Sequence, residues 1–474
     1  MDRLKSAAAK VGLILNERKC EVISPTPLTS APNTFSNFRQ ILIPEATMLG
    51  APLFGGKAMD ETWESHSDNL HRAASRLINL SSHDALVILK HSLSLPKLLF
   101  TLRCTFSGDH PIPPLMDAKM RELLSQILNV DLTDEQWDQA TLPVKWGGIG
   151  IRKTVQVAPS AFLASAAGVV DLVSAILPAK SRQMASSSSD IALSTWKSFG
   201  GETPPGLQEA RIQKLWDGQI IKKVSEGLRD RAPDDYARAR LLAVSAPHSG
   251  DWLNAPPISA VGLRLSNETL RISAGLRLGA NLCAPHVCRC TAPVDARGHH
   301  GLSCTRSAGR QMRHSLLNDI IFRALSRAKV ASVKEPAGLV PGTSLRPDGA
   351  TLIPWTKGKC LAWDATCADT MAQSHLTGTR SASGSAAMHA SSLKHQKYSN
   401  LSPSHSLIAV AVETFGSWSQ EGLEFVKELG KRISASTGDP RETSFLFQRL
   451  SVAVQMGNAA CIMGTLPVGA DEDD

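Results

Sequence analysis

The sequence predicts a multidomain protein in which an α-helical N-terminal region precedes a small metal-binding segment and an α/β domain. The chain has 474 residues, more than one typical core accommodates, so we expect two or three folded units. Apolar residues recur at helical spacing from about 58 to 180, whereas the last third alternates helical segments with short apolar runs. Between these parts, cysteines and histidines gather from Cys288 to Cys304.

The N-terminal region begins with pieces too short to form a domain. Residues 1–57 contain a short helix that ends in "AAAKVGLILN" and an apolar run, "MLGAPLFGG", that is closed by glycines. From 58 to 180 the pattern is helical, with breaks at Pro96 and Pro143. One helical stripe in this region consists of Leu70, Ala73, Ala74, Leu77 and Leu80.

The segment "VAPSAFLASAAGVVDLVSAILP" approaches the length of a membrane span. Asp171 interrupts it and small polar residues dilute it, so we interpret it as a buried helix and expect no membrane contact. Residues 181–207 contain "SRQMASSSSD" and "GGETPPG", a composition that predicts a flexible linker. A mixed-charge helical connector, 208–282, follows.

The C-terminal part alternates helices and strands. The segment "GRQMRHSLLNDIIFRALSRA" has apolar residues at helical spacing, and strands are predicted at "ASVKEP", "ATLIPW", "KCLAWDAT" and "LIAVAVET". The last of these runs is continuously apolar, as in a strand buried on both faces. Helices are predicted at about 385–399, 418–435 and 440–462, and "DEDD" forms a solvated tail.

The net charge and the cysteine spacing indicate which binding partners and which cellular compartment to expect. The formal net charge is +8 and the pI about 9.0, which favours a polyanionic partner. A basic stripe with Asp319 as its single acid consists of Arg306, Arg310, Arg313, Arg323, Arg327 and Lys329. The nine cysteines lack the spacing of a disulfide framework, and the first twenty residues do not form a signal peptide. The expected location is therefore intracellular and nuclear.

The cysteine-rich segment has the ligand types of a structural zinc site. Cys288 and Cys290 are followed by His299 and His300 and then by Cys304, and four such ligands close a tetrahedral Zn²⁺ site. Either histidine fits the spacing. Cys283 and His286 lie nearby and could replace a ligand, and the alternative is a loop with free cysteines.

Two aspartates on predicted neighbouring strands could bind Mg²⁺. Asp348 lies in "RPDG" and Asp364 in "KCLAWDAT", with Glu335 upstream in "VKEP". Strand periodicity puts Asp364 on one face and Leu361, Trp363 and Ala365 on the core face. By itself, Pro-Asp-Gly is more often a turn.

A third cluster of chemistry-bearing residues is "SSLKHQKYSNL" on a predicted helix. Lys394 lies three residues before Lys397 and four before Tyr398, so these side chains share a face. A lysine beside metal-bound carboxylates could orient the attacking water and offset charge on a pentacovalent phosphate. The alternative is a solvated basic helix face.

Taken in order, these motifs resemble the restriction-like endonuclease region of site-specific non-LTR retrotransposons. The segments "CRCTAPVDARGHHGLSC", "GRQMRHSLLNDII", "EPAGL", "RPDGATLIPW", "WDATCADT" and "KHQKY" carry the resemblance over about 280–465. It implies a PD-(D/E)xK-type nuclease fold with a CCHC zinc knuckle immediately upstream, Zn²⁺ as structural and Mg²⁺ as catalytic cofactor, and target DNA and element RNA as partners.

The resemblance also implies roles for single residues. Asp348 and Asp364 match the metal-binding acids, and Glu335 matches an accessory acid. His300, which precedes "GLSC", matches the knuckle histidine better than His299. Thr366 stands where the generic pattern has its lysine.

Two sets of basic residues complete the implied site. The lysine role passes to Lys394 or Lys397, and we favour Lys397 because it adjoins Tyr398 and lies nearer the helix end. Arg313-His314 matches a basic-histidine pair, and the expected nucleic-acid contacts are Arg306, Arg310, Arg313 and His314.

The N-terminal segment resembles the end of a reverse transcriptase palm. "VGLILNERKCEV" is similar to the motif, here Gly12, Leu15, Asn16, Lys19 and Cys20, that follows the catalytic strand pair, and "MLGAPLFGG" is similar to the primer grip. The helical stretch that includes "LPVKWGGIGIR" is similar to the thumb. Asp2 is the sole carboxylate among the eleven residues before Gly12, so we expect no polymerase activity from this chain alone.

These inferences combine into one expected organisation: a palm remnant (1–57), helical thumb and connection (58–180), flexible linker (181–207), helical connector (208–282), zinc knuckle (283–306), endonuclease (307–465) and acidic tail (466–474). The expected activity is metal-dependent nicking of target DNA for target-primed reverse transcription. A non-catalytic nucleic-acid-binding fragment of a decayed element is the alternative. The oligomeric state does not follow from the sequence.

Overall fold

The computed structural model describes residues 2–25, 35, 37–176 and 186–467. The chain forms two compact units, each assembled from several segments. Unit 1 comprises Met1–Ala74, Leu95–Lys119 and Lys153–Ile220, and unit 2 comprises Ser75–Ser94, Met120–Arg152 and Ile221–Asp474. The boundaries expected from the sequence assumed continuous segments and do not coincide with these units.

Unit 1 is mainly helical. Its short strands form a parallel pair, β1 (Glu21–Ser24) with β2 (Arg39–Leu42), and an antiparallel pair, β3 (Thr47–Met48) with β4 (Ala51–Pro52). Its helices are α1 (Asp2–Lys10), most of α2 (Lys57–Leu77), α4 (Leu95–Cys104), the first part of α5 (Ile112–Leu128), α7 (Thr154–Gly168), α8 (Val170–Ile176), α10 (Ser186–Ser198) and the first part of α11 (Gln213–Asp230).

Helix α7 lies in the interior of unit 1, where it packs against α4 and α10. Its first turn is capped by the buried Asp117, whose carboxylate accepts hydrogen bonds from the backbone N–H groups of Thr154 (2.7 Å) and Val155 (3.2 Å). Burial raises the pKa of Asp117 to about 6. The segment interpreted as a buried helix is thus two helices, α7 and α8, with a bend of 52° between them, and only α7 has buried side chains.

The prediction of a flexible linker at residues 181–207 is wrong for much of that range. Ser186–Ser198 forms helix α10, in which Trp196 is fully buried. The indole N–H of Trp196 donates to the Trp216 carbonyl at 3.0 Å, and the two rings meet edge to face. Burial of this tryptophan stabilises a helix that the serine-rich composition alone does not predict. Residues 181–185 lie outside the described part of the chain.

Unit 2 begins with short helices that precede the cysteine-rich segment. They are α3 (Ser82–Ile88), α6 (Asp134–Ala140), α12 (Asp235–Val244) and α13 (Asn267–Leu278). The hairpin of β5 (His286–Val287) and β6 (Pro293–Val294) and the single-turn helix α14 (His300–Ser303) follow. The α/β part then contains α15 (Ala308–Arg327), β7 (Ser332–Lys334), β8 (Gly349–Thr356), β9 (Lys359–Ala368), α16 (Gln373–Thr379), α17 (Ser385–Lys397), β10 (His405–Glu413), α18 (Gln420–Thr437) and α19 (Glu442–Met463).

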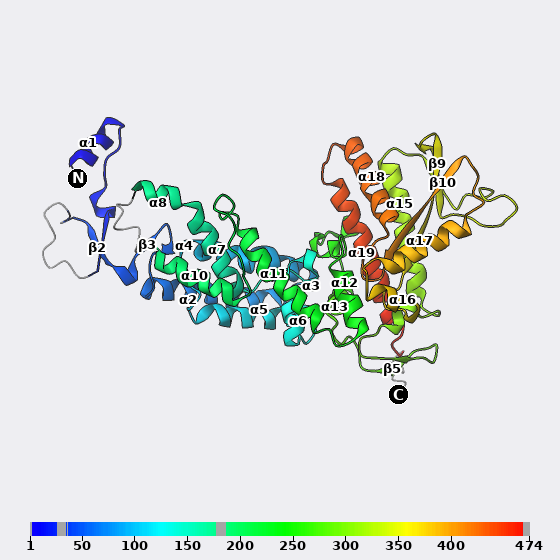
Figure 1. The fold of residues 1–474 in the computed structure, drawn as a ribbon, viewed down its shortest axis with the longest axis horizontal. Helices are drawn as coiled ribbons and strands as arrows, with labels where there is room; N and C mark the ends of the chain where they lie inside the picture. The colour runs from blue at the N-terminus through cyan, green and yellow to red at the C-terminus, as the bar shows by residue number, and fades with distance from the viewer. Residues whose placement is uncertain (1, 26–34, 36, 177–185, 468–474) are drawn as a thin grey trace. The chain divides into compact units, whose positions relative to one another are not determined.

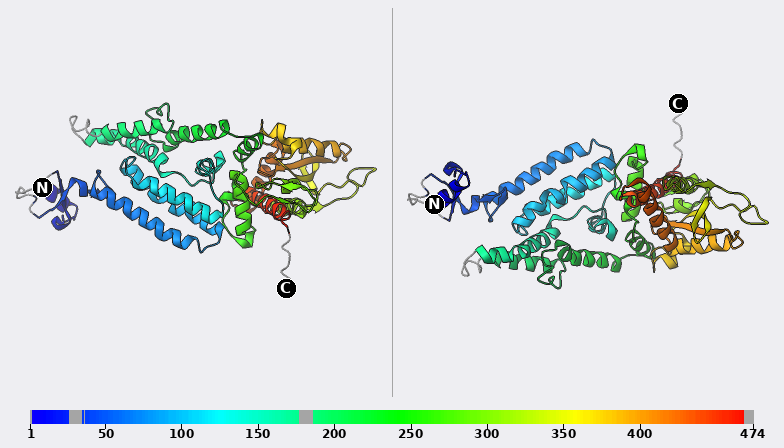
Figure 2. Two further views of the ribbon diagram at one scale, coloured as in Figure 1. Left: turned by 90° about the horizontal axis from the view of Figure 1, so that it is seen from below. Right: turned by 90° about the horizontal axis from the view of Figure 1, so that it is seen from above.

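The four strands form one mixed sheet in the order β10-β9-β8-β7. Strand β10 runs parallel to β9, which requires the crossover through α16 and α17, and the other two pairings are antiparallel. Helices α15, α18 and α19 pack together and form one core with the sheet, and α17 packs against β9 and β10 (Figures 1 and 2). The predicted helical N-terminal part and C-terminal α/β part are confirmed at this level, and all four predicted strands are present.

Strand β9 is buried on both faces. Leu361, Trp363 and Ala365 belong to the core shared with α15, α18 and α19, as the strand period predicts. Asp364, on the opposite face, is 2% exposed and faces α17. The residue paired with Trp363 on β8 is Gly349, where an added Cβ would lie 2.1 Å from the indole ring. Gly349 therefore begins a strand and makes room for the indole, so the turn interpretation of Pro-Asp-Gly is wrong.

Helix α19 connects the parts of unit 2. It contacts α13, α14, α15 and α18. Glycines permit two of these approaches: a Cβ on Gly309 would lie 2.5 Å from the Cys461 nitrogen, and one on Gly457 would lie 2.4 Å from the Arg313 Cβ. The cysteine-rich segment and the sheet therefore share one packing partner.

Two features meet a membrane-span criterion by length and composition alone. One is the helical stretch Ser82–Cys104, and the other is the bent pair α7 and α8. Core helices of soluble proteins meet the same criterion.

Candidate active site and metal cluster

Four side chains of the cysteine-rich segment converge on one point. The Sγ atoms of Cys288 and Cys304 lie 3.8 Å apart, and Cys290 Sγ lies 3.1 Å from His300 Nε2. All four ligand atoms lie within 4.8 Å of one another, so this cluster can hold a metal ion. Three thiolates and an imidazole are a donor set that zinc prefers.

The local chain geometry produces this cluster. Cys288 and Cys290 follow β5 and precede β6, and His300 and Cys304 come from α14 and the residue that ends it. A backbone hydrogen bond from Ala292 first, and then contacts from the other cluster residues, lower the pKa of the Cys290 thiol to about 7. This favours the thiolate that binds metal.

The other candidate ligands lie outside the cluster. The ring of His299 lies near Tyr236 and Phe415, with centroids 6.1 and 6.3 Å away, and burial lowers its pKa to about 4. Cys283 Sγ contacts the Asp295 carbonyl at 3.5 Å, and His286 Nε2 lies 3.1 Å from the Thr465 hydroxyl. The geometry therefore selects His300, as the resemblance implied.

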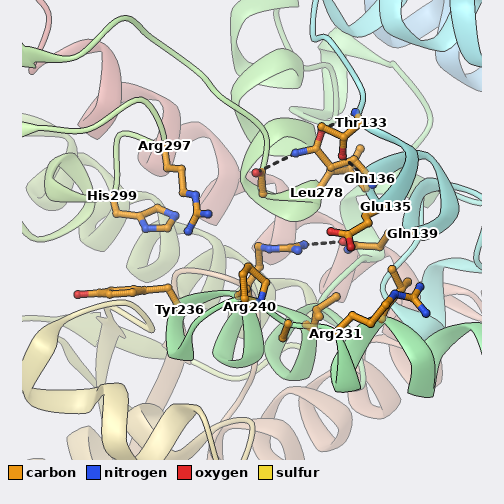
Figure 3. Close-up of a pocket in the computed structure, with 16 residues that line it drawn as sticks. Thr133, Glu135, Gln136, Gln139, Arg231, Tyr236, Arg240, Leu278, Arg297 and His299 are labelled. Atoms are coloured by element: carbon orange, nitrogen blue, oxygen red, sulfur yellow. Dashed lines mark hydrogen bonds between the residues drawn. The ribbon is translucent and has the colours of Figure 1, made fainter.

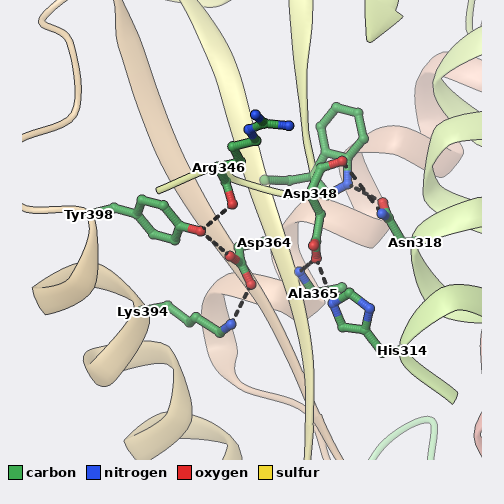
Figure 4. A network of polar contacts seen from close by, with 9 residues as sticks. His314, Asn318, Arg346, Asp348, Asp364, Ala365, Lys394 and Tyr398 are labelled. Carbon is green, nitrogen blue, oxygen red and sulfur yellow. Dashed lines mark hydrogen bonds and ion pairs between the residues drawn. The ribbon is translucent and has the colours of Figure 1, made fainter. Parts of the chain in front are cut away.

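The second candidate site lies where β8 begins beside β9. Asp348 directly precedes β8, and its Oδ2 accepts a hydrogen bond from the Ala365 backbone N–H at 2.6 Å. Because Gly349 pairs with Trp363, this register brings the Asp348 carboxylate alongside Asp364 (Figure 4). The two predicted acids therefore belong to one network.

Helix α17 contributes the cation of this network. Lys394 Nζ lies 2.5 Å from Asp364 Oδ1, and the side chain of this lysine is 23% exposed (Figure 4). Lys397 is exposed, and its Nζ lies 4.7 Å from the centre of the Tyr398 ring instead. The preference for Lys397 is therefore wrong in geometric terms, because residues three apart on a helix differ by about 60° in direction and only Lys394 points at the strand acid.

Tyr398 holds the other oxygen of Asp364. Its hydroxyl lies 2.6 Å from Asp364 Oδ2 and 2.7 Å from the Arg346 carbonyl oxygen. Burial first, and then the hydrogen bond to Asp364, raise the pKa of Tyr398, so the phenol stays protonated and donates. Sequence patterns alone assign no role to this hydroxyl, although the four-residue spacing between Lys394 and Tyr398 could have indicated it.

Helix α15 supports Asp348. His314 Nε2 lies 3.1 Å from Asp348 Oδ2, and this hydrogen bond raises the pKa of His314. The Trp363 indole N–H donates to Asn318 Oδ1 at 2.9 Å, and the Asn318 amide lies 3.5 Å from the Asp348 carbonyl. His314 was expected to contact nucleic acid, but here it pairs with an acid of the network.

Glu335 is not part of this network. It directly follows β7, and its backbone N–H donates to the Asp348 carbonyl at 3.0 Å. Its side chain is exposed, and its carboxylate makes no hydrogen bond or ion pair within the described residues. Glu335, the proposed accessory acid, therefore contacts Asp348 only through its backbone N–H.

The three arginines expected to contact phosphates differ in their exposure to solvent. Arg306 and Arg310 are exposed. Arg313 is 2% exposed and donates to Asn458 Oδ1 at 2.7 Å and to the Leu302 carbonyl at 3.4 Å. The expectation for Arg313 is therefore wrong, because a buried guanidinium that joins α15 to α19 is not accessible to a phosphate.

The Asp348–Asp364 network brings two carboxylates together. All acid donors are oxygens, which Mg²⁺ prefers. Asp364 Oδ1 is buried and makes no hydrogen bond within the described residues, although Lys394 offsets its charge. A metal ion bound at this oxygen would take the place of the Lys394 ammonium.

Comparison with known proteins does not extend this description. No protein-family model matches the chain, and no curated protein matches it either.

Proposed function

We propose that this chain is a Mg²⁺-dependent DNA endonuclease of the non-LTR retrotransposon type, with a zinc-stabilised knuckle beside its nuclease domain. One observation carries the proposal. An aspartate that directly precedes β8, an aspartate within β9 and a lysine from a packed helix lie in one polar network, as metal-dependent phosphodiester hydrolysis requires. The sequence resemblance assigns Asp348 and Asp364 to that chemistry and leaves the lysine role to Lys394 or Lys397; the ion pair with Asp364 favours Lys394.

Asp348 and Asp364 would hold the Mg²⁺ ion. When bound, the ion would polarise the phosphate and lower the pKa of a coordinated water. Lys394 is then free to approach the scissile phosphate, because the cation would take over the charge of Asp364.

The remaining residues orient these groups. Tyr398 fixes one oxygen of Asp364, and His314 and the Ala365 backbone N–H fix one oxygen of Asp348. In the hydrolysis, a water oxygen forms a bond to phosphorus while the bond from phosphorus to the 3′ oxygen breaks. The departing oxygen takes up a proton, and the products are a 3′-hydroxyl and a 5′-phosphate. The Lys394 ammonium would offset the negative charge on the non-bridging phosphate oxygens.

The surroundings of the site support a nucleic-acid substrate. The net charge is +8, Arg306 is exposed on the segment that joins the metal cluster to α15, and Arg310 is exposed in the first turn of α15. Target DNA and element RNA are the proposed partners, and the proposed location is the nucleus. The 3′-hydroxyl left by nicking would prime reverse transcription.

Nicking of supercoiled plasmid tests the proposal. The full chain, purified without chelator, is incubated with plasmid in the presence and absence of Mg²⁺. We expect nicked circles with Mg²⁺ only, and none from the Asp364→Asn variant. A chain that binds plasmid with or without Mg²⁺ and never nicks it would instead be the non-catalytic nucleic-acid-binding fragment.

A further inference from the structure

A second cluster of polar side chains surrounds a cavity elsewhere in unit 2. The cavity measures about 200 Å³ and lies between α6, α12, the end of α13 and the segment before α14. Its charged lining residues are Glu135, Arg231, Arg240 and Arg297. Figure 3 shows the Arg240 guanidinium between Arg297 on one side and Gln139 on the other. We call this cavity the Arg240 pocket.

Only one of the three guanidinium nitrogens of Arg240 donates a hydrogen bond within the described residues. Its Nη1 donates to Gln139 Oε1 and to the Arg277 carbonyl, each at 2.6 Å. Within the described residues, its Nε and Nη2 atoms make no hydrogen bond, and no carboxylate lies within ion-pair distance. Burial first, and then the charge of Arg297, lower the pKa of Arg240 to about 10, so it remains a cation at neutral pH.

The charge around the cavity is positive. Arg297 pairs with Asp234 at 3.3 Å, and both side chains are partly exposed. Arg231 and Glu135 are exposed at the rim. Three guanidinium groups thus face one lining carboxylate, and a partly buried cation without an acid partner is costly unless an anion approaches.

We infer that the Arg240 pocket binds a phosphate group. Guanidinium forks match phosphate oxygens, and the free Nε and Nη2 donors of Arg240 form the edge of such a fork. The volume of about 200 Å³ accommodates a phosphate with an attached sugar but not a longer segment of duplex. The phosphate would belong to a nucleic-acid strand or to a free nucleotide. This inference does not depend on nuclease activity.

Binding measurements on the full chain, without added divalent cation so that no cleavage occurs, test it. Three probes are titrated: inorganic phosphate, a 5′-mononucleotide, and a single-stranded oligonucleotide without a terminal phosphate. The variants are Arg297→Gln and Arg240→Lys, and the matched control is Arg441→Gln, since Arg441 also pairs with one aspartate, Asp439, at 2.9 Å. Thermal unfolding of each variant reports whether the fold is kept.

We expect inorganic phosphate to bind the parent chain and the Arg441→Gln variant alike, and Arg297→Gln to weaken it at least about fivefold. An equal weakening of the oligonucleotide assigns the pocket to an internal phosphodiester, and weakening of the mononucleotide alone assigns it to a free nucleotide. Because Arg240 also holds Gln139, Arg297→Gln is the decisive variant if Arg240→Lys unfolds. Absence of phosphate binding, or equal effects of Arg297→Gln and Arg441→Gln, would overturn the inference.

Discussion

Lys394 Nζ lies 2.5 Å from Asp364 Oδ1, which joins a helix residue to an acid on the middle of a strand. The strand itself offers no such cation, since Thr366 occupies the position two residues after Asp364. The lysine therefore comes from helix α17 through tertiary packing, whereas a lysine on the strand would be close to Asp364 in the sequence.

Replacement of Asp364 by asparagine should abolish nicking and leave DNA binding intact or slightly tighter. The substitution keeps the shape of the side chain but removes a charge that a metal ion needs. Plasmid nicking and a gel-shift assay on the same preparation measure the two effects. Asp319→Asn is the control, because Asp319 is a partly exposed aspartate that pairs with Lys334 outside the site. Nicking by Asp364→Asn at the parental rate would remove the assignment of the active site.

The two lysines of α17 should differ strongly. Lys394→Met should lower the nicking rate about a hundredfold or more, as loss of one transition-state charge contact does. Lys397→Met should stay within about threefold, because its ammonium lies over the Tyr398 ring and makes no ion pair with Asp364. Single-turnover rates at saturating Mg²⁺ give the comparison. A larger loss from Lys397→Met would show that the geometry around Asp364 rearranges on DNA.

Tyr398→Phe should weaken the site without destroying it. The variant loses the hydrogen bonds to Asp364 Oδ2 and to the Arg346 carbonyl, so one acid is held less firmly. We expect a rate loss of about tenfold together with a higher Mg²⁺ concentration for half-maximal nicking, since a single hydrogen bond to a charged group contributes about 1.5–3 kcal/mol. The shift in Mg²⁺ requirement separates positioning of Asp364 from a general loss of stability. An unchanged Mg²⁺ requirement would mean that Tyr398 acts on the fold alone.

Zinc content should depend on the four cluster residues and not on Cys283 or His299. Elemental analysis should find one zinc per parent chain and none in Cys290→Ser or His300→Asn. Cys283→Ser and His299→Asn should keep the metal, because their side chains make other contacts. Loss of zinc should also lower the unfolding temperature, since so short a segment has little core of its own. Zinc that disappears from His299→Asn and stays in His300→Asn would reverse the assignment.

The arginines before and within α15 should separate into DNA contacts and structural residues. Neutralising both Arg306 and Arg310 should weaken binding to all DNA sequences and reduce the slope of log affinity against log salt by about one to two. Arg313→Gln should instead destabilise the fold by roughly 2–4 kcal/mol, because it removes the buried contacts to Asn458 and Leu302. Salt titrations and chemical unfolding of the same variants measure both quantities. An unchanged salt slope in the double variant would assign Arg306 and Arg310 to solubility.

Periodicity predicted the elements of the α/β part well. The alternation in "KCLAWDAT" correctly assigns Leu361, Trp363 and Ala365 to the core, and the continuous run in "LIAVAVET" correctly predicts a buried strand. What periodicity does not show is that the opposite face of β9 is buried as well, since α17 packs there only after the chain has crossed over the sheet. The burial of Asp364 is a tertiary effect.

Two errors had signals in the sequence. Arg313 lies four residues before Leu317 and eight before Ile321, and all three are buried on the same side of α15. Helical spacing alone could have separated it from the exposed Arg306 and Arg310. Lys394 likewise lies four residues from Tyr398, the spacing at which two side chains point the same way. In contrast, the burial of Trp196 depends on Trp216, which no local composition reveals.

None of the residues that carry the proposed chemistry lies in α19, yet this helix packs against both α14 and α15. A premature stop anywhere between Glu442 and Met463 would leave every metal-binding candidate encoded and deprive both sites of their common support. Substitution of Gly309 or Gly457 would remove the same support. These glycines let α15 and α19 approach each other, and any side chain there would separate the two helices. Loss of function in such a gene can thus begin at positions far from any ligand or acid, while its recognisable motifs stay intact.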